Sequence, residues 1–263
     1  MRDHRPSVAA LAGCYVISLR PVGGHAAVRS AAAKHGARVL ALSPWKLQLR
    51  DDAATRANLR AALAATRVLV TSPAAVRAAH ALRPLRKRRA QAWFAVGSGT
   101  AAALRRSGIH DVVAPIRMDS EGLLALPGLR DVRGHDIGLL TAPGGRGRIV
   151  PALRRRGARV LRADVYARMP IVPSARAIAN LRTLTAPPWL LLSSGEALLQ
   201  LLGTLPRDAV ALLRKSRVVA ASLRLAELAR AQGFTRVAVA DNARPGTMLA
   251  AAAQAASSPR KRG

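Results

Sequence analysis

The chain has 263 residues, with 43 Lys and Arg against 13 Asp and Glu, which gives a formal net charge of +30. That charge favours a polyanionic partner, namely nucleic acid, an anionic membrane surface or a substrate rich in carboxylates or phosphates, and it says nothing about the fold. The single cysteine excludes an internal disulfide, which suits a reducing cytoplasm. The length corresponds to two domains at roughly 150 residues each.

Short β-branched or leucine-rich runs alternate with Ala/Leu/Arg stretches along the chain. Strands are expected at 14–19, 37–42, 67–71, 92–96, 111–114, 137–141, 158–163, 189–193, 217–221 and 236–240. Helices are expected at 24–35, 54–65, 73–82, 99–107, 120–126, 147–156, 174–183, 195–202, 206–214, 222–232 and 246–255. This alternation predicts an α/β fold with parallel sheets flanked by helices. Because no run reaches the ~18 apolar residues of a membrane span, we expect a cytoplasmic protein without a membrane partner.

The sequence repeats itself. Gly23-Gly24 and the block Gly36-Ala37-Arg38-Val39-Leu40 return 121 positions later as Gly144-Gly145 and 157–161. Two similar domains are therefore expected, with ligand binding favoured in the crevice between them.

Small hydroxyl and glycine residues follow several of the expected strands. In a parallel sheet these turns gather at the carboxyl edge, where open α/β folds bind ligands and where helix N-termini attract anions. Each serine or threonine has the alternative role of a simple helix cap. Charge and strand-end position add three arginines, and the candidates of this kind are Arg20, Thr71, Ser72, Gly97, Thr100, Gly144, Arg146, Arg148, Ser193, Ser194 and Ser222.

The sequence lacks the motifs of several common kinds of site. The six histidines lack metal-ligand spacing and only one cysteine exists, so no metal site is expected. Gly97-x-Gly99-x-x-Ala102 partly matches a dinucleotide fingerprint, but the second half of the repeat lacks these glycines.

Tyr166 lies where a strand leaves one lobe for the other, and a phenol with pKa ~10 can donate a proton at neutral pH. Its alternative role is packing at the hinge.

These residues together resemble the uroporphyrinogen-III synthase family. The matching pieces are Val70 to Val76, Val96 to Ala101 with Leu104 and Gly108, Pro143 to Arg146 through Leu153, Gly157-Ala158, Val165-Tyr166, Leu192 to Ser194, and Arg244-Pro245 with Met248-Leu249. They extend from residue 16 to about residue 252, and their order and spacing carry the resemblance.

The resemblance implies two flavodoxin-like lobes joined by a two-stranded linker. Domain 1 would combine residues 14–43 with 172–253, and domain 2 would span 49–166. The linkers would be 44–48 and 167–171, with disordered tails at 1–13 and 254–263.

The implied reaction is cyclisation of hydroxymethylbilane to uroporphyrinogen III, with loss of water, inversion of the last pyrrole ring and no cofactor. Tyr166 would protonate the leaving hydroxyl, and the strand-end residues named above would bind acetate and propionate groups. Many relatives carry a Gly/Pro-Thr turn where this chain has Ala221-Ser222-Leu223, which leaves the role of Ser222 open. The resemblance also implies a monomer and a transient handover of substrate from porphobilinogen deaminase.

Two other functions remain possible on the sequence alone. The first is a two-lobed protein that binds nucleic acid or another polyanion, favoured by the net charge and by the basic segment 83–89. Against it, aromatic residues make up only 3% of the chain, which leaves few rings for base stacking. The second is a two-lobed small-molecule-binding or regulatory protein without catalysis, an interpretation that the presence of Tyr166 disfavours.

Overall fold

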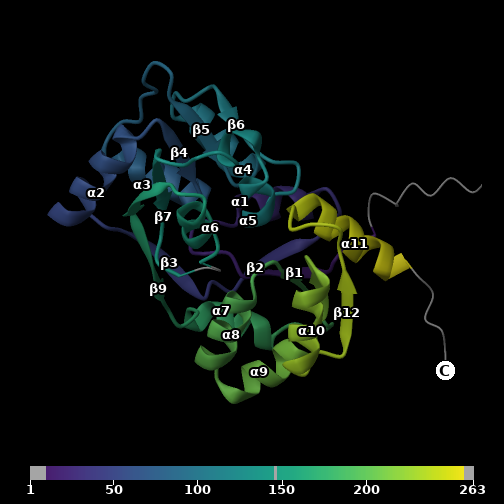
Figure 1. Cartoon of the computed structure of the whole chain (residues 1–263). Coiled ribbons are helices and arrows are strands. Elements are labelled where there is room, and N and C mark those ends of the chain that lie inside the picture. The colour runs from purple at the N-terminus through teal and green to yellow at the C-terminus, as the bar shows by residue number, and fades with distance from the viewer. Residues whose placement is uncertain (1–9, 145–146, 258–263) are drawn as a thin grey trace, which may run out of the picture. The chain divides into compact units, whose positions relative to one another are not determined.

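The computed structural model describes residues 10–144 and 147–257. The chain divides into two compact units (Figure 1). Unit 1 joins the residues up to Lys46 to those from Pro170 onward, and unit 2 is Leu47–Met169. Both divisions fall inside the segments 44–48 and 167–171 that the sequence analysis treats as linkers.

Unit 1 contains a five-stranded sheet in the order β12-β11-β10-β1-β2. Every neighbouring pair in this sheet is parallel. The strands are β1 (Tyr15–Ser18), β2 (Arg38–Ala41), β10 (Trp189–Leu192), β11 (Arg217–Ala220) and β12 (Arg236–Val239).

Unit 2 contains a second parallel sheet, in the order β6-β5-β4-β7-β8. Its strands are β4 (Arg67–Val70), β5 (Ala92–Ala95), β6 (Val112–Val113), β7 (Asp136–Thr141) and β8 (Arg159–Asp164). The repeat in the sequence pairs β7 with β1 and β8 with β2, and the two sheets then have the same order of strands. The predicted α/β fold with two similar parallel sheets is confirmed.

Both sheets follow the flavodoxin-like strand order 2-1-3-4-5 when β1 and β7 each count as strand 1. The chain of unit 1 leaves after its second strand, passes through unit 2, and returns for its third. Unit 2 is therefore entered at its third strand, β4, and its strands 1 and 2 come last. This circular permutation places both ends of unit 2 next to the connecting strands.

The connection consists of β3 (Trp45–Leu49) and β9 (Tyr166–Pro170), which form a two-stranded sheet. The residue pattern marked these segments only as proline-containing linkers, whereas the family resemblance implied two strands. Nearby, the Ile171 N–H donates to the carbonyl of Pro44 at 3.0 Å. Pro44 precedes β3 and Pro170 is the last residue of β9, end positions at which a proline is tolerated.

Helices of unit 2 cover both faces of its sheet. One core joins α2 (Ala53–Ala64), α3 (Pro73–Leu82) and α4 (Ser98–Arg106) to side chains such as Val68, Trp93 and Leu140. The other joins α5 (Ser120–Leu124), the short 3-10 helix η1 (Pro127–Leu129) and α6 (Ile149–Arg155) to Leu69, Phe94 and Leu139. Consecutive strand residues thus enter opposite cores, as the two-residue period of a strand requires.

Unit 1 is built on the same plan. On one face, α1 (Ala26–Ala33) and α11 (Pro245–Ser257) share a core with Val16, Leu191 and Val219. The remaining helices are α7 (Ala175–Arg182), α8 (Gly195–Thr204), α9 (Arg207–Arg214) and α10 (Leu223–Ala231). Each carries buried apolar residues at helical spacing, for example Leu198 and Leu201 on α8. None of the helices in the described part of the chain has the length and hydrophobicity needed to cross a bilayer.

The described ends of the chain differ from the expected tails. Leu11 is fully buried in the core of α1 and α11, although it falls in the range 1–13. Helix α11 continues to Ser257 and so enters the range 254–263. Apolar residues near both ends belong to the same buried core, which includes Leu11, Ala252 and Ala253.

Candidate functional site

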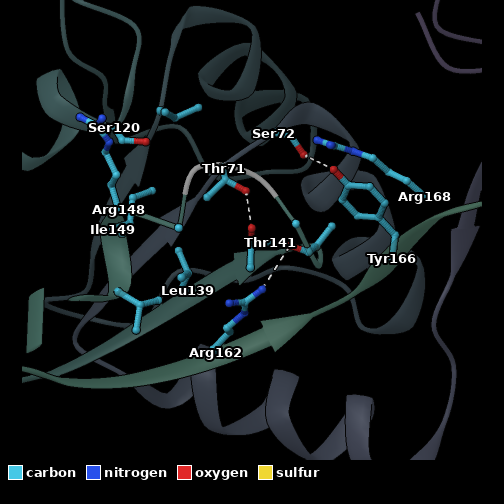
Figure 2. Close-up of a pocket in the computed structure, with 15 residues that line it drawn as sticks. Thr71, Ser72, Ser120, Leu139, Thr141, Arg148, Ile149, Arg162, Tyr166 and Arg168 are labelled. Atoms are coloured by element: carbon cyan, nitrogen blue, oxygen red, sulfur yellow. Dashed lines mark hydrogen bonds between the residues drawn. The ribbon is translucent and has the colours of Figure 1, made fainter. Parts of the chain in front are cut away.

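The carboxyl edge of the unit 2 sheet contains a cavity of about 210 Å³. It lies where β4 and β7 are neighbours but the chain continues from β4 to one side and from β7 to the other. Such a reversal of direction opens the crevice in which α/β folds bind ligands. The polar residues lining the cavity are Thr71, Ser72, Ser120, Thr141, Arg148, Arg162, Tyr166 and Arg168 (Figure 2).

The hydroxyl of Tyr166 reaches this cavity from the first position of β9. Its ring packs in the core of unit 2 and the residue is 5% exposed. Its Oη lies 3.1 Å from the Oγ of Ser72, and Figure 2 shows the two hydroxyls pointing toward each other. Ser72 Oγ also accepts the N–H of Ala75 at 3.0 Å, so the same serine begins α3 and contacts the tyrosine.

A second hydroxyl pair joins the two strands at the base of the cavity. Thr71 Oγ1 donates to Thr141 Oγ1 at 2.9 Å, which links the end of β4 to the end of β7. Gly144 lines the same cavity with φ at +84°, a left-handed conformation that glycine adopts without strain. Its partner in the expected turn, Arg146, lies outside the described residues.

Of the described residues, three arginines line the cavity, and carboxylates of the same unit bind two of them. Arg148 Nη1 donates to Glu121 Oε1 at 2.5 Å. Arg162 donates through Nε and Nη2 to Asp164 Oδ1, at 3.0 and 2.9 Å, and through Nη2 to the carbonyl of Ala142 at 3.3 Å. The third, Arg168 on β9, lines the same cavity as Ser72 and Tyr166 (Figure 2).

Arg162 and Arg168 were not among the residues expected from the sequence. A signal for them did exist, because Arg162, Asp164, Tyr166 and Arg168 occupy alternate positions in an extended segment. Alternate positions of an extended chain face the same side. Applying this period from Tyr166 backward and forward would have grouped the two arginines with the tyrosine.

Gly97 and Thr100 do not line this cavity. Gly97 begins α4, and Thr100 is 3% exposed on the first turn of that helix. Met118 covers the turn, since its Sδ accepts from the Ser98 Oγ at 3.3 Å and its Cβ lies 3.0 Å from the place a Gly97 side chain would take. A role for either residue in substrate binding stays a prediction.

Four further candidates stand at the corresponding edge of the unit 1 sheet. Arg20 follows β1, Ser193 and Ser194 follow β10, and Ser222 precedes α10. Ser194 Oγ accepts the N–H of Ala197 at 3.3 Å as a helix cap, whereas the side chain of Ser222 makes no cap hydrogen bond. Burial lowers the pKa of Arg20.

His25 is a buried polar residue of unit 1 that the sequence analysis did not single out. Its Nδ1 lies 2.9 Å from Ser18 Oγ and its Nε2 lies 2.9 Å from Ser43 Oγ, so it braces the ends of β1 and β2. Burial, and then the positive charges of Arg29 and Arg20, lower the pKa of His25. A neutral ring donates to one serine and accepts from the other.

Residues 10–144 and 147–257 contain no group of three or more His, Cys, Asp or Glu side chains that could bind a metal ion. The cavity is instead built from hydroxyl groups and guanidinium groups. Guanidinium groups bind carboxylates with paired, charge-assisted hydrogen bonds. Among the described residues, the cavity therefore offers hydrogen-bond donors suited to an anionic group, beside the hydroxyl of Tyr166.

Residues 26–250 match the family described as uroporphyrinogen-III synthase HemD. Uroporphyrinogen-III synthases of Escherichia coli and Salmonella typhimurium are each 34% identical to the chain over 161 residues, which is 60% of this chain and 65% of each relative. The aligned segment thus spans slightly less than two thirds of the length of these curated relatives.

Solved structures show the same fold. A mutant uroporphyrinogen III synthase of Thermus thermophilus has a TM-score of 0.57 and 22% identity, covering 92% of this chain and 98% of that one. The uroporphyrinogen-III synthetase of Helicobacter pylori has a TM-score of 0.58 and 14% identity over the same shares of the two chains. With a family match over most of its length, the chain belongs to the uroporphyrinogen-III synthase family.

Proposed function

We propose that this protein converts hydroxymethylbilane, a linear tetrapyrrole with eight carboxylates, into uroporphyrinogen III and water. The observation that carries this proposal is the position of the Tyr166 hydroxyl, in an arginine-lined cavity at the switch point of a parallel sheet. Membership of the uroporphyrinogen-III synthase family supports it and favours an enzyme over the alternative of a nucleic-acid-binding protein.

In the first step the terminal hydroxyl leaves as water when its C–O bond breaks. The leaving oxygen needs a proton, and Tyr166 is the group in the cavity that can donate one at neutral pH. If the Ser72 hydroxyl donates to Tyr166 Oη, the phenolic proton is free to point to the substrate. Ser72 has an oxygen lone pair already used by the Ala75 N–H, which leaves its own proton available for that bond.

In the second step the substituted carbon of the last pyrrole ring attacks the methylene group exposed by loss of water. The spiro intermediate then breaks one carbon–carbon bond and forms another, which inverts the last ring, and loss of a proton restores aromaticity. The sum of these steps is loss of one water with no oxidation or reduction, so the chemistry requires no redox cofactor. The protein contributes mainly by holding the ends of the chain in one pose.

Substrate binding would extend beyond the cavity of unit 2. A volume of about 210 Å³ is smaller than the roughly 300–1,000 Å³ of pockets that enclose a drug-sized ligand. The cavity would therefore take one end of the tetrapyrrole, with Thr71, Ser72, Gly144 and Arg148 at its carboxylates. The remaining carboxylates are proposed for Arg20, Gly97, Thr100, Arg146, Ser193, Ser194 and Ser222.

The net charge of +30 supports fast capture of an octa-anion, because an extended positive field raises association rates. We propose a monomeric enzyme of the cytoplasm that receives its labile substrate from porphobilinogen deaminase. Analytical ultracentrifugation with and without that deaminase would test both the monomer and the handover.

The direct test of the function is a coupled assay. Porphobilinogen and porphobilinogen deaminase generate hydroxymethylbilane, the protein is added, and the oxidised products are separated into isomers III and I by chromatography. Excess isomer III over the sample without protein supports the enzyme. Isomer I alone, at every protein concentration, rejects it.

A further inference from the structure

Arg148 faces the cavity of unit 2, yet its guanidinium group is already paired with a carboxylate. Its Nη1 donates to Glu121 Oε1 at 2.5 Å, and Glu121 is the one polar partner of this guanidinium among residues 10–144 and 147–257. Ser120, which precedes Glu121 on α5, lines the same cavity as Arg148 (Figure 2). Glu121 therefore stands at the edge of the site without being one of its lining residues.

Glu121 also has a second arginine nearby, Arg117. Arg117 Nη2 lies 3.8 Å from Glu121 Oε2, an ion pair between residues four positions apart, and Arg117 Nε also donates to Asp119 at 2.6 Å. Arg117 does not line the cavity. Glu121 thus keeps a cation nearby even when Arg148 turns to another carboxylate, which lowers the cost of breaking the pair.

We infer that Glu121 is a resident carboxylate that occupies Arg148 until a substrate carboxylate displaces it. The exchange replaces one guanidinium–carboxylate pair by another, so the Arg148 guanidinium keeps a carboxylate partner before and after the substrate binds. Competition from Glu121 also lowers the affinity of the site for ligands with few negative charges. Such ligands form too few ion pairs of their own to compensate for breaking the Arg148–Glu121 pair. Glu121 would in this way set the affinity and selectivity of the site for polycarboxylates. This inference rests on the proposed function, since the ligand is taken to be a polycarboxylated tetrapyrrole.

The test is a double-mutant cycle on binding rather than on turnover. Uroporphyrin III, the stable oxidised form of the proposed product, is titrated into wild type, E121Q, R148Q and the double variant at low salt, with porphyrin absorbance as the signal. We expect E121Q to tighten binding about two- to fivefold, in keeping with exposed ion pairs worth ~0.2–1 kcal/mol. R148Q should weaken binding in both backgrounds, and more strongly when Glu121 is absent.

The matched control is D136N, which also removes one negative charge and one arginine–carboxylate pair. Asp136 begins β7, at the opposite end of the strand from the cavity, and pairs with Arg159. Tighter binding in E121Q that vanishes once Arg148 is replaced supports the exchange. Binding no tighter than in D136N, or a gain that persists without Arg148, overturns it.

Thermal unfolding of each variant confirms that the comparison is made on folded protein, and a folded E121Q with weaker binding also overturns the inference. Failure of the proposed function has a separate signature, because wild-type protein would then produce no excess of isomer III in the coupled assay. Even then, the double-mutant cycle on uroporphyrin binding still tests the exchange at Arg148, because it does not depend on turnover.

Discussion

Ser72 Oγ lies 3.1 Å from Tyr166 Oη while it accepts the N–H of Ala75 at 3.0 Å. One hydroxyl thus begins α3 and orients the phenol that reaches the cavity. This relationship couples a structural feature of unit 2, a helix N-terminus, to the group proposed to donate the proton.

Replacing Ser72 by alanine should therefore affect both stability and turnover. Loss of the cap is expected to cost about 1 kcal/mol of unfolding free energy, and turnover should fall because the Tyr166 hydroxyl loses its partner. Ser72→Thr, which keeps the hydroxyl, should restore much of both. Chemical denaturation and the coupled assay measure the two effects.

The control for Ser72 is Ser174→Ala. Ser174 Oγ caps α7 in the same way, accepting the N–H of Ala177 at 3.2 Å, and it lies in unit 1 outside the site. We expect Ser174→Ala to lower stability by a similar amount with turnover unchanged. Equal turnover in Ser72→Ala and Ser174→Ala would show that Ser72 does not position the Tyr166 hydroxyl for catalysis.

Arg162→Gln should raise the KM for hydroxymethylbilane severalfold with kcat little changed. Arg162 lines the cavity, and removing a guanidinium group that contacts a substrate carboxylate weakens ground-state and transition-state binding alike. The salt dependence of KM should also become shallower, because salt screens exposed charges. Arg159→Gln is the control, since Arg159 begins the same strand and pairs with Asp136 instead. A KM that rises equally in both variants would contradict a direct contact.

The buried His25 predicts a pH dependence of stability. Its folded pKa is lowered, so the unfolded chain binds more protons between the folded pKa and the ordinary value near 6.5. Stability is then fully present above about pH 6.5 and is lost as the pH falls toward the folded pKa. Urea unfolding of wild type and His25→Gln between pH 5 and pH 7.5 measures this effect. Slopes against pH that are the same in both proteins would show that another group is responsible.

Gly138 explains how α2 approaches the unit 2 sheet closely. A Cβ at this position of β7 would lie 2.0 Å from the carbonyl oxygen of Ala62. Gly138→Ala is therefore expected to destabilise the protein by roughly 1–3 kcal/mol or more, because backbone must move. Gly203→Ala on α8, where the new methyl group meets nothing within 4 Å, should instead stabilise by about 0.5–1 kcal/mol. Thermal melts of the two variants should shift in opposite directions, and a Gly138→Ala melt at the wild-type temperature would refute the close packing.

The sequence predicted most of the fold because its signals are local and repeated. Each strand of the two parallel sheets lies within two residues of an expected run, and the repeat at Gly36 and Gly157 places corresponding strands in the same order. The burial of Leu11 was missed because it depends on α11, which lies more than two hundred positions further along the chain. Such a contact leaves no local pattern.

The site was predicted less completely than the fold. Thr71, Ser72, Gly144, Arg148 and Tyr166 do line one cavity, because strand ends of a parallel sheet meet at one edge. The pairing of Arg148 with Glu121, and the cover of Met118 over Gly97, were not foreseeable. Both depend on the path of the segment between β6 and α5, which has no regular period to read from the sequence.

The measurement that tests the central claim most directly is the rate at which Tyr166→Phe forms isomer III. In the coupled assay over a range of substrate concentrations, we predict that its kcat falls by about 10² or more, in keeping with loss of a general acid, with KM little changed. Tyr15→Phe on β1 is the control and should match wild type. A Tyr166→Phe variant that is folded and forms isomer III at the wild-type rate would contradict the account.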